Sequence, residues 1–85
     1  MRYLVDFRPS ALKAFDKLPR NDRLRVAEGI DGLVMTPRPA GSKKLSGEDG
    51  LWRIRVGNYR VIYKIEDNKL LILVLKIGHR KDVYR

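Results

Sequence analysis

Hydrophobic residues follow two different periods along the chain, and the change between them separates two halves. Residues 2–7 alternate weakly between apolar and polar side chains, which predicts a first strand. Two segments with apolar residues at helical spacing follow. The first predicted helix begins near Pro9 and ends at Pro19, and Asn21 or Asp22 is the expected N-cap of the second. The first half therefore predicts strand, helix, helix.

The second half changes to a period of two. Residues 36–50 are rich in Pro, Gly and Ser and predict a connecting loop. Three strands are expected after it, at about residues 51–56, 59–65 and 70–77. The resulting order, β-α-α-β-β-β, predicts an α+β fold in which both helices pack on one face of a small, mostly antiparallel sheet. A chain of 85 residues can close one apolar core, so a single domain over residues 1–85 is expected.

The dipeptide Gly57-Asn58 predicts a two-residue hairpin turn, and that turn sets the register of its strands. Arg55 then lies opposite Arg60, with Arg53 two residues further along the same face. Like charges opposed across strands are destabilising, so this arrangement indicates a site for an anion. The helices should cover the other face and leave the arginines uncovered. The aromatic residues on that other face are expected to belong to the core: Trp52, Tyr59 and Tyr63.

Charge supports this interpretation. The formal net charge is +9, and residues 36–85 carry most of it, with twelve Lys and Arg against five Asp and Glu. Such an asymmetry favours a polyanionic partner, most simply a nucleic-acid backbone. The absence of cysteine and the single histidine argue against thiolate or histidine metal sites, so no metal or cofactor is expected.

The longest purely apolar run, residues 70–75, is too short to span a bilayer, and an acid at position 6 interrupts any signal-peptide core. A cytoplasmic protein with no membrane partner is therefore expected.

Two further groups of side chains are candidates for binding. Lys43 and Lys44 lie in the predicted loop, where they form either a basic lip for RNA beside the hairpin or a solvated connector. If the turn at residues 67–68 also has two residues, three leucines fall on the arginine face and need a cover, such as the C-terminal tail or a helix of a partner. A longer turn is expected to reverse this assignment. These leucines are Leu71, Leu73 and Leu75.

Two segments carry a family resemblance. The run GNYRVIY at residues 57–63 and the ending GHRKDVYR at residues 78–85 resemble the RelE branch of the RelE/ParE toxin superfamily. The pairs Leu18-Pro19 and Lys43-Lys44 fit as well, so the resemblance spans essentially the whole chain. It implies a RelE-like fold and a small toxin that cuts messenger RNA in the ribosomal A site. It also implies a cognate acidic, RelB-like antitoxin that wraps around the toxin, in a hetero-oligomer formed from a monomeric toxin.

Cleavage of this kind needs little machinery, because the RNA 2′-hydroxyl attacks the adjacent phosphate. The protein moves two protons and stabilises the charge on phosphorus, without a metal. The resemblance implies that Arg60 contacts the scissile phosphate, Arg80 stabilises the leaving group and Tyr84 stacks on a base, with Arg85 as a further phosphate contact. The alternatives are ion pairs for the first two, a role for Tyr84 in pinning the tail, and a disordered terminus for Arg85.

Arg53 and Arg55 depart from the family pattern, in which the best-understood member carries lysines, one of them the general base. Arginine stays protonated and is a poor base, so the phosphate-clamping role survives and the base assignment does not. His79 has an unperturbed pKa near neutrality and is the candidate proton carrier, or else a surface histidine. Two other functions stay open: a ParE-like inhibitor of DNA gyrase, and a non-catalytic basic RNA-binding module.

Overall fold

The computed structural model describes residues 2–45, 47 and 50–79. The elements are, in chain order, β1 (Leu4–Phe7), α1 (Pro9–Asp16), α2 (Arg20–Leu33), β2 (Lys43–Lys44), β3 (Leu51–Val56), β4 (Tyr59–Glu66), the 3-10 turn η1 (Asp67–Lys69) and β5 (Leu71–His79). The strands form one sheet in the order β1-β5-β4-β3-β2. β1 runs parallel to β5, and the other neighbouring pairs are antiparallel. The predicted α+β arrangement is confirmed.

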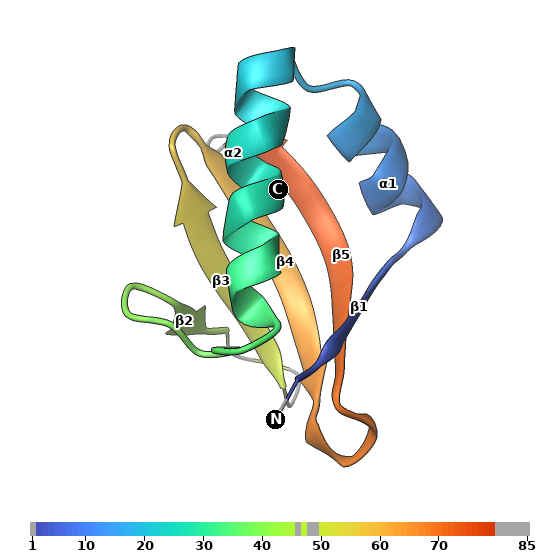
Figure 1. The fold of residues 1–85 in the computed structure, drawn as a ribbon, viewed down its shortest axis with the longest axis vertical. Helices are drawn as coiled ribbons and strands as arrows, with labels where there is room; N and C mark the ends of the chain where they lie inside the picture. Colours follow the sequence, from blue (N-terminus) through green and yellow to red (C-terminus); the bar gives the residue numbers. More distant parts are fainter. Residues whose placement is uncertain (1, 46, 48–49, 80–85) are drawn as a thin grey trace.

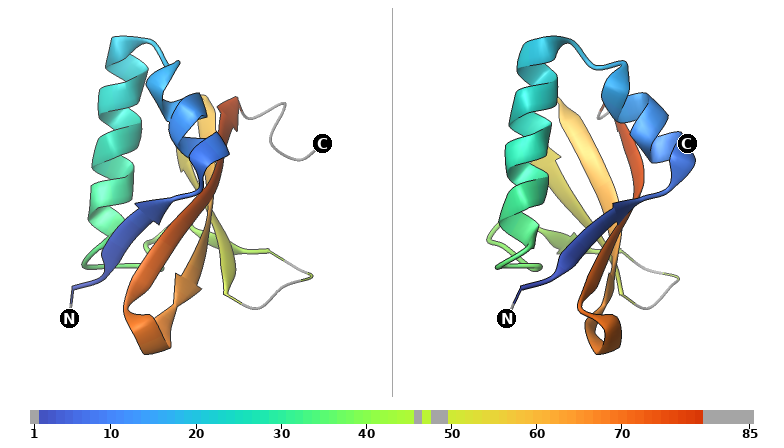
Figure 2. Two further views of the ribbon diagram at one scale, coloured as in Figure 1. Left: turned by 90° about the vertical axis from the view of Figure 1, so that its right-hand side faces the viewer. Right: turned by 45° about the vertical axis from the view of Figure 1, so that its right-hand side comes forward.

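Both helices lie on the same side of the sheet. Figure 1 shows α2 in front of β3 and β4, with α1 near the upper end of β5. The side view in Figure 2 (left) separates the layer of helices from the layer of strands. One face of the sheet is therefore packed against helices, and the other face is turned away from them. Within the described residues, no helix has both the length and the apolar character needed to cross a membrane.

The hydrophobic core fills the space between these layers. Pro9 occupies the first turn of α1, where its missing N–H costs no hydrogen bond. The apolar stripe of α2 then packs against side chains of β3, β4 and β5. Tyr63 is fully buried at the centre, and Trp52 and Tyr59 pack against the core half-buried, as predicted. The buried members of this cluster are Ala11, Val26, Ile30, Leu33, Ile54, Val61, Tyr63, Ile65, Ile72, Val74 and Ile77.

The hairpin between β3 and β4 has the predicted register. Val56 pairs with Tyr59, and Arg55 pairs with Arg60. Gly57 takes a positive φ of 58°, a conformation in which a side chain is strained and which the primed hairpin turns require at their first central position. The local turn chemistry therefore sets which side chains of both strands share a face.

The predicted cap of α2 was wrong. The helix begins at Arg20, with Pro19 at the N-cap and no side-chain capping bond. Asp22 lies inside the first turn, where it accepts a hydrogen bond of 3.0 Å from the Tyr59 hydroxyl. This contact between the helix and β4 raises the pKa of Tyr59. Asp22 therefore serves the packing of helix on sheet and does not cap the helix.

The predicted loop at residues 36–50 contains a strand. Lys43 and Lys44 form β2, which pairs with Arg53 and Trp52 of β3. Two lysines among Pro, Gly and Ser carry no local strand pattern, so this pairing depends on the neighbouring strand. β2 places an additional strand beside the beginning of β3.

Candidate functional site

Three arginines share the face of the β3–β4 hairpin that is turned away from the helices, and we call this the arginine face. Arg55 lies directly opposite Arg60, and Arg53 lies opposite Ile62. Because side chains alternate along a strand, Arg53 and Arg55 point to the face opposite Ile54, which is buried in the core. The hairpin therefore brings the three predicted arginines together.

Their exposure differs, which corrects the expectation of a fully uncovered face. Arg55 is exposed and Arg60 is half-buried, whereas Arg53 is only 4% exposed. β2 explains part of the difference, because Lys43 lies opposite Arg53 across the β2–β3 pair. At Arg53, β3 has β2 on one side and β4 on the other, whereas the end of β3 that holds Arg55 extends beyond β2.

The two β3 arginines of this face are not neutralised within the described residues. Neither Arg53 nor Arg55 forms an ion pair with a carboxylate of the described residues, and the Nε of Arg53 is buried without a hydrogen-bond partner. Burying a charge without a partner is costly, so such an arrangement favours the binding of an anion. Guanidinium groups suit phosphate because their N–H groups can bind two of its oxygens at once.

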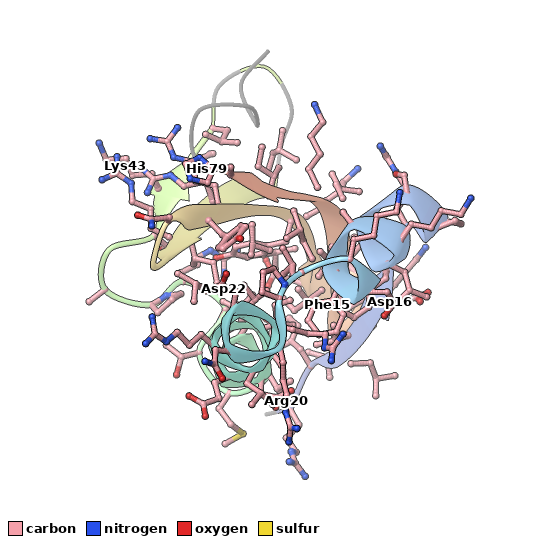
Figure 3. The ribbon with its side chains drawn as sticks, turned by 90° about the horizontal axis from the view of Figure 1, so that it is seen from above. Phe15, Asp16, Arg20, Asp22, Lys43 and His79 are labelled. Carbon is pink, nitrogen blue, oxygen red and sulfur yellow. The ribbon has the colours of Figure 1, made fainter. Side chains whose placement is uncertain are left out.

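The side chains of the two β2 lysines point to opposite faces of the sheet. Lys43 shares the face of Arg53, whereas Lys44 pairs with Trp52 and so points to the other face. Both side chains are exposed. Figure 3, which looks along the longest axis, shows Lys43 at the margin of the sheet, away from α2. The structure therefore extends the arginine face toward the sheet edge through Lys43 alone.

His79 ends β5 and is not brought onto the arginine face. It pairs with Tyr59, and the two rings meet edge to face with centroids 5.9 Å apart. Arg60 pairs with Gly78 instead, so His79 and Arg60 belong to opposite faces. The histidine is exposed at the end of the sheet. The candidates Arg80, Tyr84 and Arg85 lie outside the described residues.

The leucines of β5 adjoin the arginine face. Four residues separate Glu66 from its partner Leu71, so the turn is two residues longer than expected. Because two is an even number, each residue of β5 keeps the face that the shorter turn predicts. Leu71 and Leu73 pair with Glu66 and Lys64 and therefore share the arginine face. The expectation that a longer turn would reverse the assignment was wrong.

The remaining leucine, Leu75, falls at a β-bulge. Ile62 pairs with Lys76 and Tyr63 with Val74, which leaves Leu75 as the extra residue of β5. Like Leu71 and Leu73, it is half-buried.

An apolar residue that we did not single out from the sequence completes this region. Leu4 of β1 lies beside Leu71 in the parallel pair and is 72% exposed. Because side chains alternate along β1, Leu4 lies on the face opposite Val5 and Phe7, which pack against the core. The parallel pairing with β5, which has no local signal, brings it to the leucines.

A second charged cluster lies at the other end of β4. Asp67 accepts hydrogen bonds from the Tyr3 hydroxyl at 2.6 Å and from Arg38 at 2.9 Å. These donors lower the pKa of Asp67, and the carboxylate in turn raises the pKa of Tyr3. The Arg38 guanidinium also lies 5.5 Å from the centre of the Trp52 ring. This cluster ties the first strand, the 36–42 segment and the β4–β5 turn together.

Comparisons with known proteins agree with the geometry. Residues 5–84 match the family described as ParE toxin of type II toxin-antitoxin system, parDE. Toxin RelG of Mycobacterium tuberculosis is 33% identical over 100% of this chain and 99% of its own. The mRNA interferase toxin RelE of Escherichia coli K12 is 29% identical over 95% of this chain and 86% of its own.

Solved structures show the same fold. The archaeal RelE–RelB complex of Pyrococcus horikoshii contains a chain that superposes with a TM-score of 0.84 at 33% identity, covering 98% of this chain and 100% of that one. The resemblance seen in residues 57–63 and 78–85 is thereby confirmed. The chain belongs to the RelE/ParE superfamily of type II toxin–antitoxin toxins and is a RelE-like member of it.

Proposed function

We propose that this toxin is a metal-independent endoribonuclease that cleaves messenger RNA positioned by the ribosome. The observation that carries the proposal is the pair Arg55 and Arg60, directly opposed on the side of the hairpin that is turned away from the helices. Two guanidinium groups that face each other across neighbouring strands can bind the oxygens of one phosphate between them.

The chemistry assigned to this site uses the substrate's own nucleophile. The 2′-hydroxyl of the RNA attacks the adjacent phosphorus, the bond to the 5′-oxygen of the next nucleotide breaks, and a 2′,3′-cyclic phosphate forms. Arg55 and Arg60 stabilise the negative charge on the phosphorane oxygens, and the positive charge of Arg53 adds to this electrostatic stabilisation. The ribosome supplies the alignment that such a small site lacks.

Proton transfer is assigned to groups at the end of β5. Arginine stays protonated near neutral pH and is a poor base, so His79 remains the candidate proton carrier, reaching the phosphate around the end of the sheet. Arg80 and Tyr84 follow it in the chain and are proposed to stabilise the leaving group and to stack on a base. Arg85 and the β2 lysines, Lys43 and Lys44, are proposed as further RNA contacts.

The name of the E. coli relative, mRNA interferase toxin RelE, supports this reaction. The Pyrococcus structure is a complex of RelE with RelB, which supports an acidic RelB-like antitoxin as the partner of this chain. Its binding surface is proposed to include the leucines Leu71, Leu73 and Leu75 beside the arginine face, because an amphipathic acidic helix matches both features.

The test is to express the chain alone and map the ends of a reporter message by primer extension. Cuts inside codons that appear only when the message is translated support the proposal. Arg60→Ala should abolish them, whereas Arg25→Ala removes the same charge from an exposed position of α2 and serves as the matched control. Equal cutting by both variants would refute the role of the hairpin.

The family description favours a second candidate, because the matched family is that of ParE toxins. On this reading the protein inhibits DNA gyrase by binding it and leaves RNA intact. Supercoiling by gyrase is therefore assayed in parallel with the message ends. Blocked supercoiling with uncut messages supports this second function, and the absence of both effects supports a non-catalytic RNA-binding module.

A further inference from the structure

A cleft of about 710 Å³ opens between α2, the 36–41 segment and the edge of β3. Its lining combines cationic and apolar side chains with two glycines of α2. The principal lining residues are Gly29, Gly32, Lys43, Arg53, Ile54 and Val56. A volume of this size lies within the range of sites that hold a small molecule or a single unit of a polymer.

The cleft is open because part of β3 has no neighbouring strand on its outer edge within the described residues and Gly32 of α2 has no side chain. β2 pairs with β3 only at Trp52 and Arg53, so the outer edge of β3 from Ile54 onward has no neighbouring strand in the described residues. On the helix side, a Cβ added to Gly32 would meet no atom within 4 Å. Gly29 differs, because a Cβ there would lie 2.8 Å from Val56, so this glycine is needed for packing of the helix on the strand. Of the two α2 glycines that line the cleft, Gly32 is the one that leaves space for a side chain.

Cationic side chains outnumber acidic ones in the lining of the cleft. Arg53 is 4% exposed, its Nε has no hydrogen-bond partner, and it has no ion pair among the described residues. Lys43 lies opposite it on β2, and Arg55 also lines the cleft. Glu28 is the one carboxylate of the lining, on the helix side. A buried arginine with an unpaired Nε and no ion pair indicates a site for a negatively charged ligand.

The cleft is continuous with the arginine face. Arg53 and Arg55 belong to both, so one strand of RNA can contact the arginine face and the cleft together. A phosphate fits the cationic side, while Ile54 and Val56 offer an apolar surface for a sugar or base. The Glu28 carboxylate can accept hydrogen bonds from the amino or imino groups of a base.

We propose that this cleft binds one nucleotide of single-stranded RNA, with its phosphate toward Arg53 and Lys43 and its base against Ile54 and Val56. The proposal rests on the proposed cleavage of RNA and names the subsite that reads a nucleotide beside the scissile phosphate. A segment of the antitoxin is the competing occupant. RNA is favoured because it supplies a phosphate for Arg53 and hydrogen-bond donors for Glu28 in a single unit.

Binding is measured first, by titrating the four ribonucleoside 3′-monophosphates, with inorganic phosphate as the comparison, into isotope-labelled full-length protein. The Arg60→Ala background removes the proposed scissile-phosphate contact and allows the toxin to be produced. We expect the amide signals of Gly29 and Gly32 to shift with a nucleotide, at an affinity about tenfold or more above that of phosphate. Equal affinity for phosphate and all four nucleotides, or no shift at these glycines, would overturn the proposal.

Three substitutions identify the cleft as the place of binding. Gly32→Phe fills the open space and should weaken nucleotide binding by about tenfold or more, whereas Gly32→Ala should change it by less than about twofold. Leu24→Phe puts the same ring on an exposed position of α2 that does not line the cleft, and should also have little effect. Circular dichroism of each variant verifies that α2 is intact. Loss of binding in Leu24→Phe as well as in Gly32→Phe would refute the assignment.

Cleavage separates this inference from the proposed function. In a translating system, Gly32→Phe should redistribute the cut positions along the message relative to the unmodified toxin. Identical positions and rates in both would overturn the inference while leaving the endoribonuclease in place. Nucleotide binding at the glycines without any RNA cleavage would overturn the function and preserve the nucleotide site. If Gly32→Phe loses only neutralisation by a co-expressed acidic antitoxin, the occupant is the antitoxin and the proposal is wrong.

Discussion

Two arginines of this protein, Arg38 and Arg53, have opposite environments. Arg38 has a side chain that is 43% exposed, yet it forms an ion pair with Asp67 and lies over Trp52. Arg53 is 4% exposed, and no described carboxylate neutralises it. If stability alone were selected, the buried Arg53 would have the ion pair, because a charge removed from water costs more free energy when it has no partner. The difference shows that Arg38 contributes to holding the fold together, and it supports the proposal that Arg53 binds a ligand from outside.

Removal of a cation from the arginine face should have the largest effect. We expect Arg60→Ala to reduce RNA cleavage by at least about 100-fold, because it deletes a group that stabilises charge in the transition state. Single-turnover cleavage of a ribosome-bound message measures the effect. Arg25→Ala, with the same loss of charge, should stay within about threefold of the unmodified protein. A similar loss in both variants would mean that net charge, and not the arginine face, is responsible.

Stability separates the two arginines directly. Arg53→Met should raise the free energy of unfolding by about 1–2 kcal/mol, because it replaces a buried charge without a partner by an apolar side chain of similar length. The same variant should cleave RNA poorly. Arg38→Met should have the opposite sign and destabilise the protein. Urea denaturation measures both, and a shift of the two variants in the same direction would contradict the contrast.

Tyr63 anchors the segment that carries Arg38. Its hydroxyl donates a hydrogen bond of 2.7 Å to the Pro37 carbonyl, and Tyr63→Phe should cost about 0.5–1.5 kcal/mol by removing that bond. Burial raises the pKa of Tyr63 to about 12. The unfolded chain therefore loses this proton first, from about pH 10, while the folded protein keeps it.

The stabilisation linked to this proton is present below pH 10 and is lost as the pH rises toward 12. The free energy of unfolding of the unmodified protein should fall more steeply over this interval than that of Tyr63→Phe. Parallel slopes, measured by denaturation at several pH values, would show that the phenol is not protected by burial.

The smallest effect is expected at Asp67. Asp67→Asn removes the carboxylate shared by Tyr3 and Arg38, and because this cluster is exposed the melting temperature should fall by only about 1–3 °C at neutral pH. The pKa of Asp67 is lowered in the folded state, so its contribution is present above the unfolded pKa of a carboxyl and disappears as the pH falls through the folded value. The difference between the two proteins should therefore vanish in acid. A constant difference at every pH would exclude the charge as its cause.

Much of the candidate site was predictable because it depends on local chemistry. The turn Gly57-Asn58 sets the pairing of β3 with β4, and the alternation of side chains then places Arg55 opposite Arg60. The periodic apolar residues of both helices likewise predict which faces are buried. None of these inferences needs information from distant parts of the chain.

The errors concern contacts between segments far apart in the sequence. Lys43 and Lys44 become a strand only because β3 offers an edge, and the same pairing flanks Arg53, which the sequence alone suggested to be uncovered. Asp22 looked like a helix cap, but Tyr59 from β4 engages its carboxylate. In each case a partner from another element gives the residue a role that its local pattern does not predict.

The helices, the hairpin and the cationic face follow from the amino-acid sequence, because periodicity, turn residues and charge act within a few positions of the chain. The burial of Arg53, the parallel docking of β1 beside β5 and the cleft next to Gly32 depend on the folded protein. Burial and empty space are properties of the neighbours that packing brings together, and those neighbours come from elements distant in the sequence.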